Sequence, residues 1–489
     1  MGNIRKCGMI HPLRSRCRVS STSHSHLRIP FLGNIGKRIP QPDIGSNKKE
    51  KKPRLRKSEN GGDGDGGDDS SYLGFDAKPY KKMMEKKGHL FVLLTIFAST
   101  LFCSGSKNNH HQHQPEPQLV NVDDYGATAN GDDNSEAFME AWRIACDSSG
   151  EREFVVPENK VYHLKPITFS GPCKPNFKFK VYGTIKASSH RLDYDKDRRH
   201  WIMFKHLENF VVEGGGTFNG NGRIWWSKSC KVDETQPCIG APTAVTFKNC
   251  KNLKVNNIRT KNPQQIHLTF LNSLNVRATN LRVIAPANSP NTDGVHISDS
   301  QNVQIINSVV KTGDDCVSIV NGSRNVVISK ITCGPGHGIS IGSLGKYNSE
   351  NEVSNILVDK AVISDTTNGV RIKSWQGGSG YARNIKFQNI IMHNVTNPII
   401  VDQNYCDRKK ECKEQHSAVQ IENVIYRNIK GTSNSEVAIN FDCSKTFPCR
   451  SILLENILLN REGNEGDMKA SCSNVMLATR GVVIPRVND

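Results

Sequence analysis

The 489-residue chain is too long for one small core and is sufficient for one large domain or two to three ordinary ones. Its 65 basic and 47 acidic residues give a net charge of +18, which predicts a polyanionic partner: a nucleic acid, an anionic membrane or an acidic polysaccharide. The charge is uneven, since residues 1–106 hold 20 basic and 9 acidic residues and the remainder 45 and 38. Charge alone does not select among these three partners.

Residues 1–82 do not have the composition of a folded domain. Asn47–Ser71 joins a basic run to a run of glycine and aspartate, and such a sequence is too polar to bury a core. We therefore predict that residues 1–82 are a disordered basic and Gly/Asp-rich extension. Because a secretory signal follows this extension, we do not expect it to bind nucleic acid.

Residues 83–106 have the pattern of a secretory signal. Two lysines precede a 14-residue apolar stretch, Leu90–Cys103, and small residues follow it. A membrane-spanning helix needs about 20 apolar residues, whereas a signal core needs about 7–15. We predict a signal peptide and a secreted, extracellular protein. Because a signal normally begins a chain, either translation starts within this segment, or the segment is an uncleaved anchor with a basic cytoplasmic tail.

The cysteine count supports export. Twelve cysteines lie beyond the signal segment, and an even number suits disulfides formed in an oxidising compartment. The close pairs Cys406–Cys412 and Cys443–Cys449 predict two small disulfide loops, and we expect Cys316–Cys333 to crosslink neighbouring turns. Two glycosylation sequons, at Asn321 and Asn394, also fit a secreted protein.

A polar linker at residues 107–118 leads into a single predicted domain at residues 119–489. The domain begins with the only segment that has a helical period, "NSEAFMEAWRIACDSS", in which Asn134 or Ser135 can cap the first turn. Beyond this segment, apolar residues alternate with polar ones. We predict a short N-terminal capping helix followed by strands.

A strand-like unit then recurs, in which an asparagine is followed by an apolar, a variable and an apolar residue. It runs from "NLKVNNI" at Asn252 to "NVIYRNI" at Asn423, and the unit at Ser273 has serine in place of asparagine. The first apolar positions are 253, 274, 303, 326, 356, 385 and 424. Steps of this length with a strand pattern are typical of a stacked solenoid.

These features predict an all-β fold, a single-domain right-handed parallel β-helix. No helical stretch separates the units, which disfavours a βαβ sheet, and neither a leucine consensus nor a Trp-Asp dipeptide is present. A β-sandwich would need hairpin turns that the pattern lacks. Each turn should bury its valines and isoleucines, and each corner asparagine should hydrogen-bond to the asparagine of the next turn.

Three aspartates interrupt this apolar pattern. Asp293 lies in "SPNTDGVHIS", and Asp314 and Asp315 lie in "GDDCVSI". A buried strand tolerates a carboxylate only where something compensates its charge. In a parallel β-helix, residues one turn apart lie about 4.8 Å apart, and the 21 residues from Asp293 to Asp314 match the local repeat length. We therefore predict that the three carboxylates meet on adjacent turns.

The next two turns extend this column with cationic residues. His337 follows Asp314 by 23 residues, and Arg371 and Lys373 face the same way because they are two apart in a strand. Clustered carboxylates raise one another's pKa, so one can retain a proton as a general acid while another activates water. This chemistry fits glycoside hydrolysis, although Gly-Asp-Asp alone also occurs in turns, Ca²⁺ sites and polymerase metal sites.

Five ordered motifs resemble the signature of the plant polygalacturonases, glycoside hydrolase family 28. The motifs are "SPNTDG", "GDDCVSI", "GPGHGISIGSLG", "GVRIKSWQGGSG" and "VDQNYCD", and the resemblance extends from about Val120 to the C-terminus. It implies inverting hydrolysis of α-1,4-linked galacturonan, the acidic homogalacturonan of pectin, by an enzyme located in the plant cell wall. By this resemblance, Asp314 is the general acid, Asp293 and Asp315 hold and deprotonate the water, and His337 supports the acid.

The resemblance also implies the residues that bind the substrate. Arg371 and Lys373 would bind the galacturonate carboxylate, Tyr405 would line the groove, and Asn291 would shape the aspartate cluster. It implies no metal and no organic cofactor, and we expect a monomer. Two alternatives remain at this stage: a pectate lyase, which needs Ca²⁺ and a basic residue to abstract a proton, and a non-catalytic pectin-binding β-helix.

Overall fold

The computed structural model describes residues 4–6, 116–407, 412–464 and 466–487. The predicted signal segment and almost all of the predicted extension and linker lie outside these residues. No helix in the described ranges is long and apolar enough to cross a membrane.

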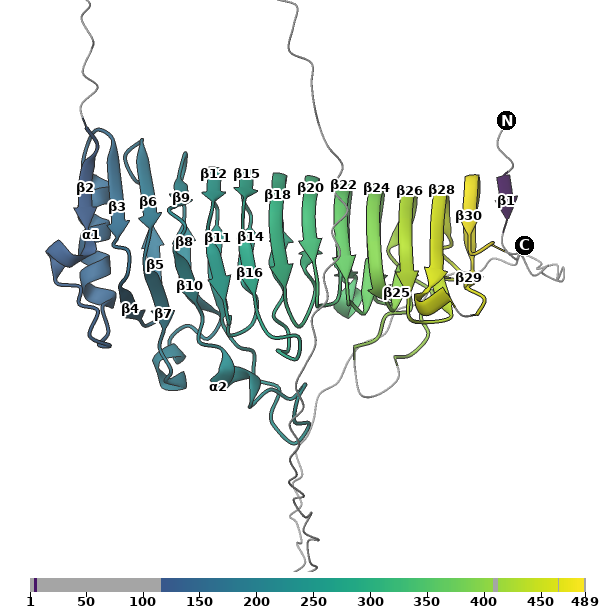
Figure 1. The fold of residues 1–489 in the computed structure, drawn as a ribbon, viewed down its shortest axis with the longest axis horizontal. Coiled ribbons are helices and arrows are strands. Elements are labelled where there is room, and N and C mark those ends of the chain that lie inside the picture. The colour runs from purple at the N-terminus through teal and green to yellow at the C-terminus, as the bar shows by residue number, and fades with distance from the viewer. Residues whose placement is uncertain (1–3, 7–115, 408–411, 465, 488–489) are drawn as a thin grey trace, which may run out of the picture. The chain divides into compact units, whose positions relative to one another are not determined.

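The strands of residues 116–487 form two sheets that wind together as one coil, with the turns stacked in chain order (Figure 1). Every strand pairing in these residues is parallel, as between β11 (Thr243–Lys248) and β14 (Leu268–Leu271). The one antiparallel pairing among all described strands joins the short β1 (Ile4–Lys6) to β30 (Val475–Ile484). The prediction of a parallel β-helix is therefore confirmed, and the β-sandwich alternative is wrong.

The smaller sheet has 11 strands, one from each successive turn. They are β5 (Ile167–Ser170), β8 (His200–Lys205), β11 (Thr243–Lys248), β14 (Leu268–Leu271), β17 (Val295–Ser298), β19 (Val317–Ile319), β21 (Ile339–Leu344), β23 (Asn368–Ser374), β25 (Asn397–Asp402), β27 (Val437–Asp442) and β29 (Lys469–Ser473).

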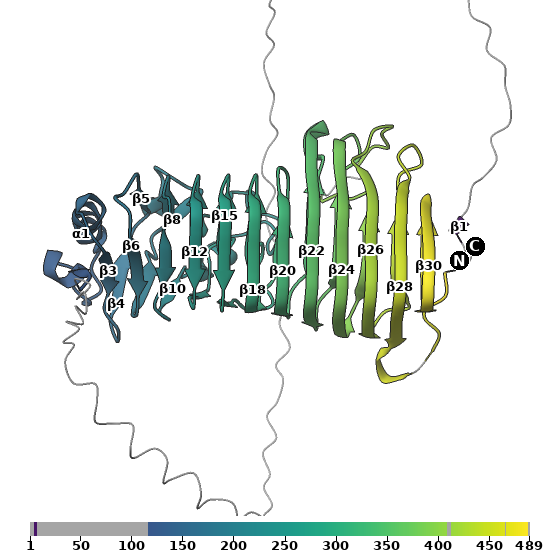
Figure 2. The ribbon, with the colours of Figure 1, turned by 90° about the horizontal axis from the view of Figure 1, so that it is seen from above.

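The larger sheet has 19 strands, and its later members are long and lie side by side (Figure 2). Besides β1 it contains β2 (Gln118–Asn121), β3 (Arg152–Val156), β4 (Val161–Leu164), β6 (Phe177–Val181), β7 (Thr184–Ala187), β9 (Val211–Glu213), β10 (Thr217–Asn219), β12 (Lys251–Asn256), β13 (Arg259–Lys261), β15 (Leu274–Thr279), β16 (Arg282–Ile284), β18 (Gln301–Lys311), β20 (Arg324–Cys333), β22 (Glu350–Ser364), β24 (Ser379–Val395), β26 (Gln420–Ser433), β28 (Cys449–Arg461) and β30 (Val475–Ile484).

The helix α1 (Ser135–Asp147) caps the first turns, as predicted. It buries Phe138, Ala141 and Trp142, and the Trp142 ring lies 4.8 Å from that of Phe169. A second helix, α2 (Arg223–Trp226), is only four residues long and was not predicted. Short 3-10 turns complete the helical elements: η1 (Val122–Tyr125), η2 (Arg191–Tyr194), η3 (Lys346–Asn348) and η4 (Glu462–Asn464).

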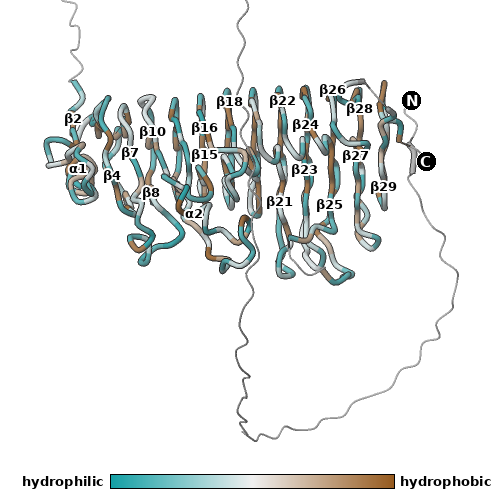
Figure 3. The backbone as a smooth tube through the Cα atoms, turned by 60° about the horizontal axis from the view of Figure 1, so that its bottom comes forward, coloured by the Kyte–Doolittle hydropathy of each residue, from teal (hydrophilic) through white to brown (hydrophobic). Residues whose placement is uncertain are grey.

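Inside the coil, apolar side chains of one turn stack on those of the next. Apolar segments recur along the strands of successive turns (Figure 3), and Leu253 of β12 pairs with Val276 of β15, which pairs with Val303 of β18. The predicted alignment of Leu253 with Leu274 is therefore wrong by two residues. Leu274 is 37% exposed, because the corner of that turn is formed by Asn275 rather than by Ser273.

The corner asparagines form a continuous ladder, as predicted. In each step the side-chain amide donates to the amide oxygen of the preceding turn at 2.7–3.1 Å. Each of these residues has a left-handed backbone, which asparagine tolerates better than most other residues. The ladder runs through Asn209, Asn252, Asn275, Asn302, Asn325, Asn355, Asn384 and Asn423.

Five disulfides join cysteines of the described residues. The three predicted pairs, Cys316–Cys333, Cys406–Cys412 and Cys443–Cys449, are all present. The other two are Cys146–Cys173, which ties the end of α1 to the loop after β5, and Cys230–Cys238, which closes the loop after α2.

Candidate active site

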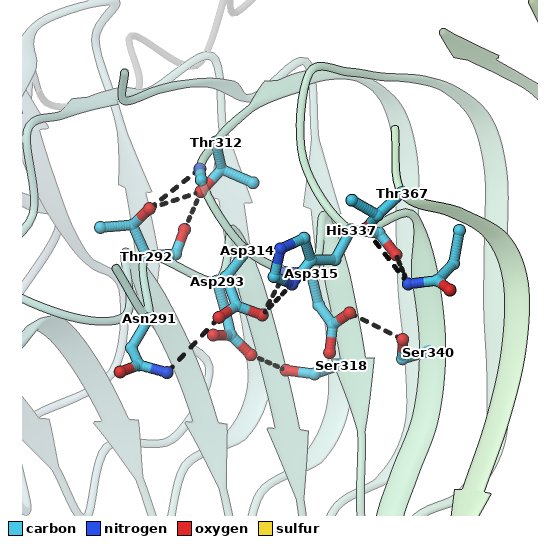
Figure 4. A network of polar contacts seen from close by, with 12 residues as sticks. Asn291, Thr292, Asp293, Thr312, Asp314, Asp315, Ser318, His337, Ser340 and Thr367 are labelled. Atoms are coloured by element: carbon cyan, nitrogen blue, oxygen red, sulfur yellow. Dashed lines mark hydrogen bonds and ion pairs between the residues drawn. The ribbon is translucent and has the colours of Figure 1, made fainter. Parts of the chain in front are cut away.

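The three predicted aspartates and His337 precede strands of the smaller sheet, on three successive turns. Val295 pairs with Val317, and Val317 with Ile339, so the register repeats every 22 residues here. Asp293, Asp315 and His337 therefore share one register position, and Asp314 lies one residue earlier. The predicted 21-residue match of Asp293 with Asp314 is thus wrong by one residue, but the three carboxylates do meet in space (Figure 4).

Asp314 lies between an amide and an imidazole. Its carboxylate is 3.1 Å from Nδ1 of His337 and accepts a hydrogen bond from the Asn291 amide at 3.4 Å. It also accepts from the backbone N–H of Asp315 at 2.7 Å, and the N–H of His337 donates to the Asp314 carbonyl at 2.7 Å. These contacts hold the carboxylate of Asp314 against the imidazole ring of His337.

Asp315 is fully enclosed and accepts hydrogen bonds from three side chains. Its Oδ1 accepts from the Arg371 guanidinium at 2.9 Å and from Ser340 at 2.7 Å, and its Oδ2 accepts from Lys373 at 3.0 Å. Arg371 also donates to the Ser340 hydroxyl at 3.0 Å. Since Asp315 is 1% exposed, this cationic cluster compensates a charge that burial would otherwise make very costly.

Asp293 has a different environment. Its Oδ2 accepts a hydrogen bond from Ser318 at 2.8 Å, and the Ser318 hydroxyl lies 2.8 Å from Nδ1 of His296. Burial lowers the pKa of His296 to about 4, so this imidazole is neutral near neutral pH. Asp293 therefore has hydrogen-bonding neighbours but no ion-pair partner among the residues that the structure describes.

The three carboxyl groups do not share protons equally. Burial, and then the negative charges of Asp314 and Asp315, hold the pKa of Asp293 well above its ordinary value. Burial also opposes ionisation of Asp314, but the hydrogen bond and charge of His337, the backbone N–H of Asp315 and the charge of Lys373 together place the pKa of Asp314 below its ordinary value. The free site therefore holds a proton more tightly on Asp293 than on Asp314, which is ionised near neutral pH.

Tyr405 completes the cationic side of the site. Its ring lies 5.4 Å from the Lys373 ammonium and packs edge-on against Trp375 at 5.4 Å. Burial raises the pKa of Tyr405 to about 12, so the phenol stays protonated. Tyr405 can therefore donate a hydrogen bond while its ring faces a cation.

A single cavity of about 460 Å³ collects the predicted site. All eight predicted residues line it: Asn291, Asp293, Asp314, Asp315, His337, Arg371, Lys373 and Tyr405. Residues that sequence reasoning missed also line it: Lys231, His296, Ser318 and Asp407. His296, Ser318 and Ser340 follow one another at intervals of 22 residues, so the repeat length could have predicted that the two serine hydroxyl groups lie beside the aspartates. No such spacing in the sequence points to Lys231 or Asp407.

Asp314, Asp315 and His337 also have the spacing of a metal site, with ligand atoms within 4.8 Å of one another. The neighbours of Asp315 argue against this use. Both of its oxygens already accept from cationic donors, Arg371 and Lys373, and a metal ion would have to displace them or lie beside them. The donor set therefore fits an anionic ligand better than a cation.

The fold and the site together define a β-helical protein with a carboxylate-based active site on its smaller sheet. Residues 146–481 match the model of "Glycosyl hydrolases family 28". The chain is 58% identical over 380 residues to polygalacturonase QRT2 of Arabidopsis thaliana, covering 77% of this chain and 86% of that protein. It is 57% identical over 360 residues to polygalacturonase-2 of Solanum lycopersicum, covering 73% and 78%. The chain belongs to glycoside hydrolase family 28.

Solved structures agree on the fold. The polygalacturonase of Erwinia carotovora matches with a TM-score of 0.62 at 22% identity, covering 74% of this chain and 98% of that one. The exopolygalacturonase of Thermotoga maritima matches with a TM-score of 0.61 at 21% identity, covering 75% and 94%. At these identities the likeness concerns the β-helix alone.

Proposed function

We propose that this glycoside hydrolase cleaves the α-1,4 linkages of polygalacturonan, the acidic backbone of pectin. The observation that carries the proposal is the joining of three carboxylates to an arginine and a lysine in one cavity. The carboxylates supply acid and base, and the cations select a negatively charged sugar. The names of the two relatives, both polygalacturonases, support the same substrate.

In this proposal Asp314 protonates the leaving oxygen. Asp314 is ionised in the free site, so it must gain a proton when the substrate binds. A sugar carboxylate that enters the cavity adds negative charge and displaces water, and both effects favour the protonated form of Asp314. His337, 3.1 Å away, can transfer a proton to Asp314 whenever its ring is protonated.

Asp293 and Asp315 hold and deprotonate the attacking water. Both lie at the same register position on adjacent turns, so one water can contact both carboxylates. Asp315 forms ion pairs with Arg371 and Lys373, whereas the pKa of Asp293 is raised, so Asp293 gives up its proton more reluctantly. We therefore assign the stronger hold on the water to Asp315.

In this proposal Arg371 and Lys373 also bind the carboxylate of the galacturonate unit. In the free protein both donate to Asp315, but each keeps further N–H donors that the substrate can use. The sugar carboxylate would thus share a cation pair that Asp315 already positions. Tyr405 lines the same side of the cavity.

A product analysis on de-esterified polygalacturonate, with a chelator present, tests the proposal. We expect new reducing ends, no ultraviolet-absorbing unsaturated product, and first products of inverted anomeric configuration by NMR. Unsaturated, Ca²⁺-dependent products would instead establish a lyase. Retained configuration would establish a covalent intermediate and overturn the assignment of a base-activated water.

We further propose that the enzyme acts outside the cell. The five disulfides support this location, because such bonds persist in oxidising compartments. Fractionation of an expressing plant cell should recover the protein in the wall. Recovery of the enzyme in the cytosol with reduced cysteines would contradict the proposal.

A further inference from the structure

A second cavity, of about 820 Å³, adjoins the active-site cavity. The two cavities share four lining residues: Lys231, Pro290, Asn291 and Asp407. The second cavity extends toward earlier turns of the coil, where Arg191, Trp225 and Gln264 line it. The two cavities are therefore neighbouring parts of one groove along the smaller sheet.

The second cavity contains polar groups that the protein itself does not satisfy. Gln264 is 1% exposed, and its Oε1 has no hydrogen-bond partner among the described residues. The indole N–H of Trp225, which is 6% exposed, likewise lacks a partner there. The Arg191 guanidinium lies 4.7 Å over the Trp225 ring. A buried acceptor, a donor and a cationic group suit a sugar with hydroxyl groups and a carboxylate.

One ion pair crosses the boundary between the two cavities. The Lys231 ammonium lies 2.5 Å from the Asp407 carboxylate, although the residues are 176 positions apart. Each residue directly follows a cysteine of a small disulfide loop, Cys230–Cys238 for Lys231 and Cys406–Cys412 for Asp407. The pair therefore joins two residues that are each anchored beside a disulfide.

This ion pair is of a kind that a competing anion can break. The Lys231 and Asp407 side chains are 47% and 45% exposed, and half-exposed ion pairs stabilise a protein little. The negative charge of Asp407 also acts on Tyr405 in the active site. A substrate carboxylate placed at the boundary would be attracted by Lys231 and repelled by Asp407.

We propose that the Lys231–Asp407 ion pair is an electrostatic latch across the groove, which a galacturonate carboxylate opens by replacing Asp407 on Lys231. The inference rests on the proposed function and adds a specificity to it. A methyl-esterified unit has no charge with which to displace Asp407. The latch therefore favours polymer whose unit at the boundary carries a free carboxylate.

Two single variants separate the halves of the latch. In Asp407→Asn, Lys231 is left free for the substrate, so we expect KM for de-esterified polygalacturonate to fall about three- to tenfold with kcat unchanged. In Lys231→Gln, we expect KM for that substrate to rise about three- to tenfold, while KM for highly methyl-esterified pectin changes less than about twofold.

Lys160→Gln is the matched control. Lys160 is 46% exposed and pairs with Asp123 at 2.7 Å, but it lies outside both cavities, so its loss should leave both KM values unchanged. Melting temperatures check that all three variants are folded. An Asp407→Asn variant with unchanged or raised KM, or a Lys231→Gln variant equally impaired on both substrates, would overturn the latch.

The two proposals fail in different ways. If the wild-type enzyme does not hydrolyse polygalacturonate, the proposed function is wrong. If the wild type is active and both latch variants behave like Lys160→Gln, the proposed function stands and the latch is wrong.

Discussion

The asparagine ladder of the larger sheet and the acid cluster of the smaller sheet are both columns of polar residues stacked one turn apart. In the ladder every member is the same neutral amide, and each donates to its neighbour and accepts from the next. In the acid cluster the side chains are of several kinds: the aspartates accept hydrogen bonds from, or pair with, serine, histidine, lysine and arginine.

The difference lies in how the two columns satisfy their polar groups. In a row of identical amides, each side chain finds its hydrogen-bond donor and acceptor in the neighbouring amides, so the ladder needs no other group and is a structural element. The aspartates cannot satisfy one another, because like charges at one strand spacing repel. The aspartates therefore need protons, cationic side chains and hydroxyl groups as hydrogen-bonding partners. Those same groups can take part in acid–base catalysis and in substrate binding. Four substitutions test this contrast.

The largest effect is expected at Asp314. Asp314→Asn should lower kcat for polygalacturonate by about 10³- to 10⁴-fold, because the variant has no acid at the leaving oxygen. Release of reducing ends measures the loss. The matched control is Asp359→Asn, since Asp359 stands in an amide column and accepts from Asn389 at 2.7 Å. Near-normal turnover by Asp314→Asn would remove this residue as the acid.

Asp315 should affect stability as well as activity. Asp315→Asn leaves the buried Lys373 and the partly buried Arg371 without a carboxylate, and loss of one partner of a buried ion pair costs about 3–5 kcal/mol. Denaturant unfolding monitored by tryptophan fluorescence measures the change. A decrease in the free energy of unfolding below about 1 kcal/mol would contradict this, because it would show that water solvates the two cations in place of the carboxylate.

Asp402 gives a pH-dependent effect of intermediate size. Burial, then the charge of Asp442 on the next turn, raises the pKa of Asp402 from 3.8 to about 6. A raised pKa favours the protonated folded state, so its contribution is complete below pH 4 and is lost as pH rises through 6. The full shift corresponds to about 3 kcal/mol. Asp402→Asn should therefore raise Tm at pH 7 but not at pH 4; equal shifts at both pH values would contradict this.

The smallest effect is expected in the ladder. Asn325 donates to Asn302 at 3.0 Å and accepts from Asn355 at 2.9 Å, with a left-handed φ of 56°. Asn325→Ala should cost about 1–2 kcal/mol and leave kcat unchanged. Asn325→Gly should cost less, because glycine adopts this backbone freely. Equal losses in both variants would assign the whole effect to the hydrogen bonds.

The fold was predictable because every turn must bury the same apolar face and bend at the same corner. Alternating valine and isoleucine with a corner asparagine specifies a strand and a bend each time, and the ladder confirms it. Among the corner positions the predicted alignment is wrong only at Ser273, because Asn275 forms that corner. Ser273 and Asn275 are two residues apart and fit the same sequence pattern, and only the left-handed backbone of Asn275 distinguishes them.

The site was predictable as far as it follows the register. Asp293, Asp315 and His337 share a position, and Arg371 and Lys373 follow in the next turn, so spacing alone brought them together. The roles of the eight predicted residues stay predictions. Lys231 and Asp407 could not be predicted, because they lie on loops without a repeat and meet across 176 residues.

The five disulfides of the described residues are all local, with sequence separations of 27, 8, 17, 6 and 6. Crosslinks that close such short segments constrain the unfolded chain less than long ones. A reductant should therefore change the protein unevenly: the coil would remain wound, while Lys231 and Asp407 would each lose the crosslink at the preceding cysteine. Redox conditions around the enzyme would then govern access to the groove before they govern survival of the fold.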